Sequence, residues 1–411
     1  MFKVSEQIRI ILTLALLFSV HEAYSWTSPT NVAVSSAVID DHSGTITDLK
    51  YDASSDVLWV VYSNPTELTK SGLHQVTGAS TASRVVNPYN TTSNATLLTD
   101  VQNIKKIVLA DANTIYGVTS TGKVVKAVLS RSAMTWNDQQ DFSKETTDVS
   151  SFIKDGNNLY AATSYGVAKG VIASSDITWS WISGDGAGSA SLLSATSLAV
   201  SGGFLYAGGP DGVMKMATTA SSPSWTPIPS IRNIKNLAVV NNILYASTTD
   251  AAFYSLPISA ATWTTIKLAS GGLEPVIHSL VPLSHGLNML GMTSSASSSS
   301  TDDGNIGLLN STSGLSDNYY FDFIRTNDCS NAYPSSEYLD ITQVISNGDA
   351  KAFGRFQMGG YAERISQVSL PLPMVGLAVQ GVVQVLVAQE AVVEIRKHRF
   401  VLLLLQLRQL R

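Results

Sequence analysis

Residues 204–213 read FLYAGGPDGV, and a tryptophan, Trp225, follows them. The same order occurs four times in the chain: Ile or Leu, then Tyr, then small residues, a Gly six positions after the Tyr (Ala in the last copy), and a Trp near nineteen. The copies are Ile115-Tyr116-Gly117 with Gly122 and Trp136, Leu159-Tyr160-Ala161 with Gly166 and Trp179, Leu205-Tyr206-Ala207 with Gly212 and Trp225, and Leu244-Tyr245-Ala246 with Ala251 and Trp263. The tyrosines stand 44, 46 and 39 residues apart, which indicates a true repeat.

A period of roughly 40 to 45 residues that holds several short strands is typical of β-propeller blades. In the copy around Tyr206, strands are expected at 196–200, 204–208, 212–217 and 224–228. The turns at 201–203 and 209–211 contain Gly and Pro, which supply the backbone angles of tight hairpins. The small residues that follow Tyr160 and Tyr206 are expected to lie where neighbouring blades approach closely. These are Ala161, Ala162, Ala207, Gly208 and Gly209.

Weaker copies extend the repeat in both directions. They include Leu58-Trp59-Val60 with Gly72-Leu73, Leu287-Asn288-Met289 with Gly307-Leu308, and the stretch 344–367. The predicted fold is therefore all-β, a single β-propeller of about seven four-stranded blades over residues 46–370. Six or eight blades also fit the loosely periodic ends. The alternating stretch 31–39 is expected to pair with the last blade and close the ring, which removes exposed sheet edges.

Composition narrows the functional classes. Charged residues make up 14% of the 411 residues, compared with roughly 25% in an average globular protein. The formal net charge is -5. The composition gives no sign of a basic patch that could neutralise phosphates, so no nucleic-acid partner is expected.

The two ends of the chain differ from the repeats. Lys3 and Arg9 flank the entry to an apolar run at 10–20 that leads to small residues before Trp26, which predicts a signal peptide at 1–25; an uncleaved anchor is the alternative. The expected propeller domain is 26–372. The tail 373–411 is rich in Val, Gln and Leu. Polar residues interrupt its apolar stretches too often for a stable membrane span. We interpret it as a frameshift product or an unselected tail outside the fold.

The repeats resemble those of the Asp-box (BNR-like) propellers, which include sialidases and the ectodomains of sortilin-type receptors. The resemblance covers residues 103–273, and its motif is degenerate: the segment 174–179 has the Ser, Asp and Trp of an Asp-box without its Gly. The resemblance implies a structural role in the outer hairpin, and no catalytic one. The residues concerned are Asp176, Trp179, Trp225 and Trp263.

A search for chemistry yields no catalytic, cofactor-binding or metal site. The lone Cys329 lies in a polar run without a nearby His, and no set of His and Cys has metal-ligand spacing. Asp40-Asp41 and Asp302-Asp303 read as turns. Three histidines are considered as metal ligands: His74, His278 and His285. Three of six scattered arginines could form a carboxylate-binding trio; the six are Arg84, Arg131, Arg232, Arg325, Arg355 and Arg364.

The polar insertions 87–99 and 293–304 are expected to be loops. Glycosylation sequons begin at Asn90, Asn94 and Asn310. The functional prediction is a non-catalytic binding or scaffold module, secreted or at the cell surface, for a protein or glycan partner. The alternatives are a degenerate glycan-acting hydrolase, favoured if carboxylates, Tyr and Arg converge, and an assembly factor for an exported complex.

Overall fold

The computed structural model describes residues 30–31, residues 45–266 with gaps at 53, 79–84, 131–132, 143–147, 174–175, 185–193 and 251, and a series of strands between 276 and 369. For most residues of the strands after 266, only the backbone is described. Contacts divide the chain into one unit of residues 26–370 and a second of 1–25 and 371–411. The predicted signal peptide and tail both belong to the second unit, outside the described residues.

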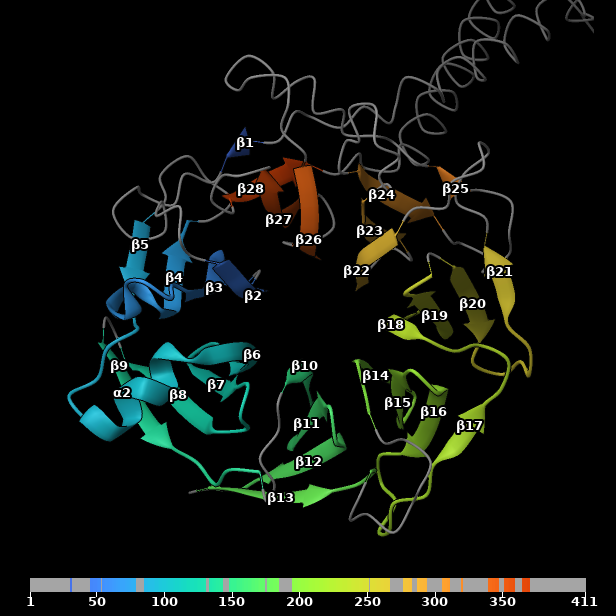
Figure 1. The fold of residues 1–411 in the computed structure, drawn as a ribbon, viewed down its shortest axis with the longest axis horizontal. Helices are drawn as coiled ribbons and strands as arrows, with labels where there is room; N and C mark the ends of the chain where they lie inside the picture. Colours follow the sequence, from blue (N-terminus) through green and yellow to red (C-terminus); the bar gives the residue numbers. More distant parts are fainter. Residues whose placement is uncertain are drawn as a thin grey trace, which may run out of the picture. The chain divides into compact units, whose positions relative to one another are not determined.

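The described chain folds into seven four-stranded antiparallel sheets (Figure 1). Six of them are meanders in which consecutive strands pair, so a repeat of about forty residues supplies one sheet; the seventh joins β1 to the last three strands. The first three sheets contain β2 (Thr45–Asp52), β3 (Val57–Ser63), β4 (Gly72–Thr77) and β5 (Val85–Pro88); β6 (Ile104–Asp111), β7 (Thr114–Thr119), β8 (Val124–Ser130) and β9 (Ala133–Asp138); and β10 (Val149–Asp155), β11 (Asn158–Thr163), β12 (Gly166–Ile172) and β13 (Ile177–Trp181).

The fourth and fifth sheets contain β14 (Ser197–Ser201), β15 (Phe204–Gly209), β16 (Gly212–Ala217) and β17 (Thr226–Ile228), and β18 (Ile234–Val240), β19 (Ile243–Thr248), β20 (Phe253–Pro257) and β21 (Thr264–Ile266). The sixth contains β22 (Val276–Pro282), β23 (Leu287–Thr293), β24 (Asn305–Asn310) and β25 (Tyr319–Tyr320). The seventh contains β26 (Leu339–Ser346), β27 (Lys351–Met358), β28 (Arg364–Ser369) and, as its fourth strand, β1 (Thr30–Asn31).

The strand β1 comes from the other end of the unit. Thr30 pairs with Gln367 and Asn31 pairs with Ser366, so an N-terminal segment completes the last sheet, as the sequence predicted. The paired segment is two residues long and begins one residue before the predicted stretch 31–39, and residues 32–39 lie outside the described residues.

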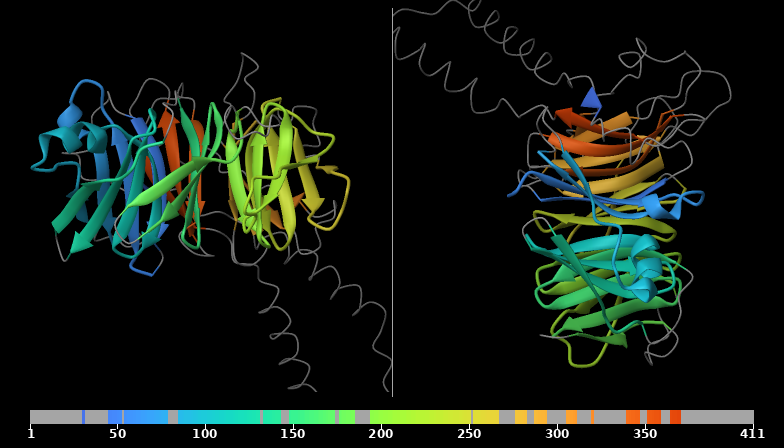
Figure 2. Two further views of the ribbon diagram at one scale, coloured as in Figure 1. Left: turned by 90° about the horizontal axis from the view of Figure 1, so that it is seen from below. Right: turned by 90° about the vertical axis from the view of Figure 1, so that its left-hand side faces the viewer.

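The first strands of successive sheets contact one another, from β2 through β6, β10, β14, β18 and β22 to β26. The series returns to its start, because β26 also contacts β2 (Figure 1). Among the described strands, the first strand of each sheet therefore contacts the first strands of two other sheets. Figure 2 shows the sheets of this unit standing side by side.

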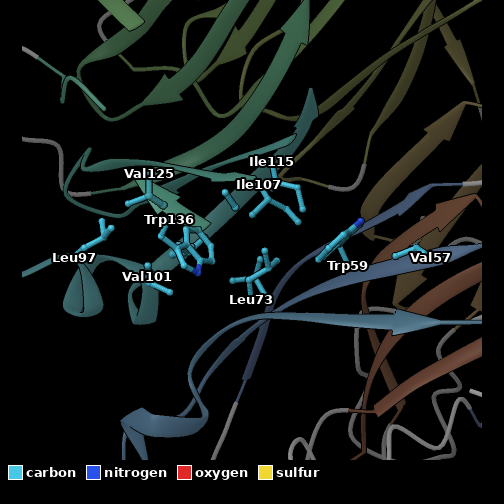
Figure 3. Close-up of a cluster of buried hydrophobic side chains, with 12 residues drawn as sticks. Val57, Trp59, Leu73, Leu97, Val101, Ile107, Ile115, Val125 and Trp136 are labelled. Carbon is cyan, nitrogen blue, oxygen red and sulfur yellow. The ribbon is translucent and has the colours of Figure 1, made fainter. Parts of the chain in front are cut away.

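The repeated aromatic residues fill the spaces between sheets. Tyr160 on β11 belongs to a buried cluster with Leu205 of the fourth sheet, and Trp225 of the fourth sheet belongs to the same cluster. Tyr therefore faces the following sheet and Trp faces the preceding one. In Figure 3, Leu73 of the first sheet lies between Trp59 of the same sheet and Trp136 of the second.

The glycines of the repeat have the two roles predicted for them. Gly202 and Gly203 in the hairpin between β14 and β15 have φ of 58° and 77°, which glycine adopts at little cost. A Cβ on Gly208 would lie 2.5 Å from Cγ2 of Ile234 on the next sheet. Gly208 therefore allows the fourth and fifth sheets to approach each other.

The insertion 87–99 is not the simple loop that its polar composition predicted. It contains the end of β5 and most of the helix α2 (Ala95–Gln102), and a 3-10 turn, η1 (Leu68–Lys70), lies close to it. The side chain of Asn94 caps α2 by accepting hydrogen bonds from the N–H groups of Thr96 and Leu97. Leu97 and Val101, four residues apart, are buried against the first two sheets. The second insertion, 293–304, lies almost wholly outside the described residues.

Within the described ranges, the structure contains no helix that is both long enough and apolar enough to cross a membrane.

Candidate functional site

Two cavities lie in succession between the fourth and fifth sheets. Both are lined by Pro227, Ile228 and Pro229, which form the end of the short outer strand β17 and the residue after it. One cavity opens at the start of β16 and β20, where Asp211 and Asp250 stand; we call it the polar cavity. The other lies toward the ends of the same two strands, and we call it the apolar cavity.

The polar cavity has a volume of about 530 Å³. Asp211 belongs to the turn between β15 and β16, and Asp250 belongs to the equivalent turn between β19 and β20 of the next sheet. Arg232 comes from the connection between the two sheets, and the ring of Tyr254 on β20 forms part of the wall. Side chains that are far apart in the sequence are thus brought to one end of two neighbouring sheets.

Asn233 holds the two acidic turns together. Its backbone N–H donates to the carbonyl oxygen of Pro210 at 3.0 Å, and its own carbonyl oxygen accepts from the N–H of Thr249 at 2.9 Å. Asn233 has a φ of 57° and Ser230, in the same connection, has a φ of 94°. Non-glycine residues adopt these angles at a cost, and such residues gather at functional sites.

The turn that carries Asp250 is also fixed from within. The Thr248 hydroxyl accepts a hydrogen bond from the N–H of Ala252 at 3.0 Å, and the N–H of Thr248 donates to the carbonyl oxygen of Ala252 at 3.0 Å. Hydrogen bonds within the folded chain therefore fix the backbone of the two turns that carry Asp211 and Asp250.

The chemistry of the polar cavity is that of hydrogen bonding to a polar ligand. Asp211, Asp250 and Arg232 are exposed to solvent, and together they offer two acceptors of charge -1 and one planar, fivefold donor. Tyr254 is half-buried and is supported by an edge contact with Trp263, whose ring centroid lies 6.4 Å away. The cavity thus combines an aromatic wall with charged groups that can bind vicinal hydroxyls.

At two junctions between sheets, the tryptophan of the repeat donates a hydrogen bond to the preceding sheet. In the first two sheets, Nε1 of Trp136 donates to the carbonyl oxygen of Tyr89, the residue after β5, at 3.0 Å. Between the third and fourth sheets, Nε1 of Trp225 donates in the same way to Ile182, the residue after β13, at 2.5 Å. The corresponding tryptophan of the fifth sheet is Trp263, and the corresponding acceptor is Pro229.

That hydrogen bond is not formed at the fourth and fifth sheets. Nε1 of Trp263 is buried without a partner among the described residues, and Pro229 lines both cavities. Two prolines in the segment 227–229 also remove backbone donors that the outer edge of a sheet would otherwise use. The segment 227–229, with its two prolines, is thus part of the wall of both cavities.

The arginine trio considered from the sequence is not assembled among the described side chains. Arg232 is the member whose side chain is described, and it stands with Asp211 and Asp250. Arg355 and Arg364 lie on β27 and β28, where only the backbone is described. Arg84, Arg131 and Arg325 lie outside the described residues, as do Cys329, His285, Asp40, Asp41, Asp302 and Asp303.

His74 is a core residue. Its side chain is 0% exposed, Nε2 lies 2.8 Å from the carbonyl oxygen of Lys70, and burial lowers its pKa to about 4. His278 lies on β22, where its side chain is not described. Within the described residues, no three His, Cys, Asp or Glu side chains form a group that could hold a metal ion.

The residues assigned a structural role by the Asp-box resemblance lie at junctions between sheets. Oδ1 of Asp176 accepts hydrogen bonds from the N–H groups of Ile177 and of Gln140, which follows β9 of the preceding sheet. Trp179 and Trp225 are buried in the clusters between sheets. These contacts are structural, although the Asp-box motif itself remains a resemblance.

The sequons differ in their environments. Asn90 is 3% exposed, and its amide nitrogen donates to the carbonyl oxygen of Thr69, so the folded chain has no room for a glycan there. Asn94 is exposed at the start of α2, and Asn310 lies at the end of β24, where side chains are not described.

The sequence search missed Asp211 and Asp250 as a pair. Each stands five residues after the repeat tyrosine of its own copy, Tyr206 and Tyr245, and the same offset in the two earlier copies gives Thr121 and Tyr165. An acidic residue at one turn of two consecutive repeats is a signal that an alignment of the copies can reveal.

No protein-family model matches the chain, and no curated protein matches it. Among solved structures, similar folds occur in the extracellular domain of the putative hybrid two component system BT4673 from B. thetaiotaomicron (13% identity, TM-score 0.56, 82% of this chain and 39% of that one) and in that of BT3049 from the same organism (12% identity, TM-score 0.52, 82% and 40%). A chain of the mitotic checkpoint complex is also similar (12% identity, TM-score 0.53, 84% and 94%).

At these identities the similarity concerns the fold alone. The chain spans about 40% of the length of the two B. thetaiotaomicron chains. The class defined so far is therefore an all-β protein of four-stranded antiparallel sheets, with the fold of extracellular domains among its structural relatives.

Proposed function

We propose that the seven sheets form one closed β-propeller, sealed by β1, and that the chain is an exported, non-catalytic binding module at the cell surface or in the extracellular space. The return of the contacts from β26 to β2 supports closure. The apolar run and small residues at 10–25, together with the extracellular origin of similar folds, support export. Under this proposal residues 1–25 are a signal peptide and 373–411 do not belong to the propeller.

The ligand that fits the polar cavity best is a glycan. Two carboxylates and a guanidinium, held on turns that Asn233 fixes, can accept from and donate to neighbouring hydroxyls, and the Tyr254 ring can stack on the apolar face of a sugar. The arrangement of Asp211, Asp250 and Arg232 at one end of two sheets is the observation that carries this proposal.

A glycan-acting hydrolase is the second candidate, because two carboxylates and a tyrosine line the same cavity. Hydrolysis of a glycosidic bond needs one carboxyl group that stays protonated near neutral pH, which burial in an apolar pocket usually provides. Asp211 and Asp250 are both exposed instead. Exposure favours binding over catalysis.

The test is a glycan array probed with the full chain as its host secretes it, followed by incubation of each bound glycan with excess protein and mass spectrometry of the glycan. The proposal expects retention of a defined set of glycans, each with unchanged mass. Cleavage of a bound glycan would establish the hydrolase, and capture of a protein partner with no glycan bound would overturn the choice of ligand.

A further inference from the structure

The apolar cavity has a volume of about 270 Å³ and lies between the fourth and fifth sheets. Its lining includes Leu244 and Leu256 on β19 and β20, Ile228 at the end of β17, and Ile258 just after β20. Its volume lies just below the roughly 300 to 1,000 Å³ of typical ligand pockets. It therefore suits a small molecule with a compact apolar body, such as one ring or a short branched chain.

A buried donor in the wall of this cavity has no partner. Tyr206 lines the cavity and is 2% exposed, and its hydroxyl is buried without a hydrogen-bonding partner among the described residues. Buried polar groups in folded proteins are almost always paired, so each exception calls for an explanation. A bound acceptor would satisfy this hydroxyl.

A cation lies in the same wall. Lys215 on β16 pairs directly with Tyr206 across the strands, and its side chain is half-buried. Its ammonium group lies 5.6 Å from the centroid of the Phe204 ring, which is two residues from Tyr206 on the same face of β15. Tyr206 and Lys215, which pair across the strands, thus bring a hydroxyl and an ammonium-bearing side chain to the lining of one cavity.

The charge of the lining decides the ligand class. The residues that line the apolar cavity include Lys215 and no acidic side chain, whereas the polar cavity has Asp211 and Asp250. Ammonium groups bind carboxylates by charge-assisted hydrogen bonds that strengthen away from bulk water. An anionic acceptor is therefore favoured over a neutral or cationic one.

We propose that the apolar cavity binds a small organic carboxylate with a compact apolar body. Its carboxylate accepts from the Tyr206 hydroxyl and pairs with the Lys215 ammonium group, and its apolar body packs between Leu244, Leu256 and Ile228. The site is separate from the glycan site, because its polar contacts come from the Tyr206–Lys215 pair and not from the two acidic turns.

The test measures binding of benzoate and isovalerate to the full chain by titration calorimetry, with benzyl alcohol as a neutral probe of similar size. Saturable binding of at least one carboxylate is expected, with affinity at least tenfold above that for benzyl alcohol. Lys215→Met is expected to weaken binding at least tenfold, and Tyr206→Phe about fivefold.

The matched controls are Lys169→Met and Tyr160→Phe. Lys169 and Tyr160 form the equivalent cross-strand pair one sheet earlier, and the Tyr160 hydroxyl is likewise buried without a partner among the described residues, so these changes reproduce the chemistry away from the cavity. Their binding is expected to match that of the unmodified chain. Tyr206→Phe removes only an unpaired hydroxyl, and urea midpoints confirm that each variant is folded.

The proposal is overturned if neither carboxylate binds saturably, if benzyl alcohol binds as tightly as benzoate, or if the Tyr206 and Lys215 variants bind like the controls. None of these outcomes bears on glycan binding at Asp211 and Asp250, so the two proposals fail separately.

Discussion

The backbone N–H of Asn233 lies 3.0 Å from the carbonyl oxygen of Pro210 and donates a hydrogen bond to it. Through this bond the connection between the fourth and fifth sheets fixes the turn that carries Asp211. The carbonyl oxygen of Asn233 accepts from Thr249 and so fixes the turn that carries Asp250. One residue with positive φ therefore links the backbones of the two turns that carry Asp211 and Asp250 in the polar cavity.

Replacing Asn233 separates the effect of its backbone angle from that of its side chain. Asn233→Ala is expected to lower the free energy of unfolding by about 1 kcal/mol, because alanine is strained at a φ of 57°. Asn233→Gly is expected to be close to neutral, since glycine adopts this angle freely. Urea denaturation measures both. Equal losses in the two variants would show that the Asn233 side chain, not its backbone angle, stabilises the junction.

The tryptophan hydrogen bonds between sheets predict a difference between two equivalent residues. Trp225→Phe removes the bond from Nε1 to the carbonyl oxygen of Ile182, whereas Nε1 of Trp179 has no partner among the described residues. Both changes remove the same ring volume, so Trp225→Phe is expected to be more destabilising by about 1 to 3 kcal/mol. Chemical denaturation of both variants tests this; a Trp179 variant at least as unstable as the Trp225 variant would contradict it.

The close approach at Gly208 predicts a coupling between two sheets. Gly208→Ala is expected to cost about 1 to 3 kcal/mol, because its Cβ would lie 2.5 Å from Cγ2 of Ile234. Ile234→Ala removes that methyl group and leaves room for the new Cβ. In a double-mutant cycle the combined loss should be smaller than the sum of the single losses, and strict additivity would argue against contact between these residues.

His74 predicts a loss of stability in mild acid. Its pKa falls from 6.5 in the unfolded chain to about 4 in the folded protein because the ring is buried. Between these two pH values the unfolded state binds a proton at His74 and the folded state does not. The stabilisation is complete above pH 6.5 and is lost as the pH falls toward 4, by up to about 3 kcal/mol. Urea midpoints across this range should fall more steeply for the unmodified chain than for His74→Gln. Parallel curves would mean that His74 is protonated in the folded state.

The repeat made the central sheets predictable. The strand expected at 212–217 is β16 (Gly212–Ala217), and the strand expected at 204–208 ends one residue later, at Gly209. Tyr and Trp mark each copy because they pack against neighbouring sheets, where their size is needed. The four-stranded antiparallel sheets could therefore be predicted from local signals that recur with one period.

The site could not be predicted in the same way. Arg232 was considered as part of a carboxylate-binding trio, but its neighbours in the structure are Asp211 and Asp250, which come from two different repeats. Their proximity depends on the spacing of the fourth and fifth sheets, which the period does not specify. The helix α2 was not predicted, because the polar composition of the insertion 87–99 indicated a loop. The cap at Asn94 and the pair Leu97 and Val101, four residues apart, are the signals of the helix.

The central claim is that the polar cavity between the fourth and fifth sheets is the binding site. Its most direct test is a glycan array that compares the unmodified chain with Asp211→Asn combined with Asp250→Asn, and with Asp138→Asn as a control on an exposed aspartate of β9. The double variant is expected to lose at least nine-tenths of the signal for every glycan that the unmodified chain binds, while the control keeps it. Full retention of the signal by the double variant would contradict the claim.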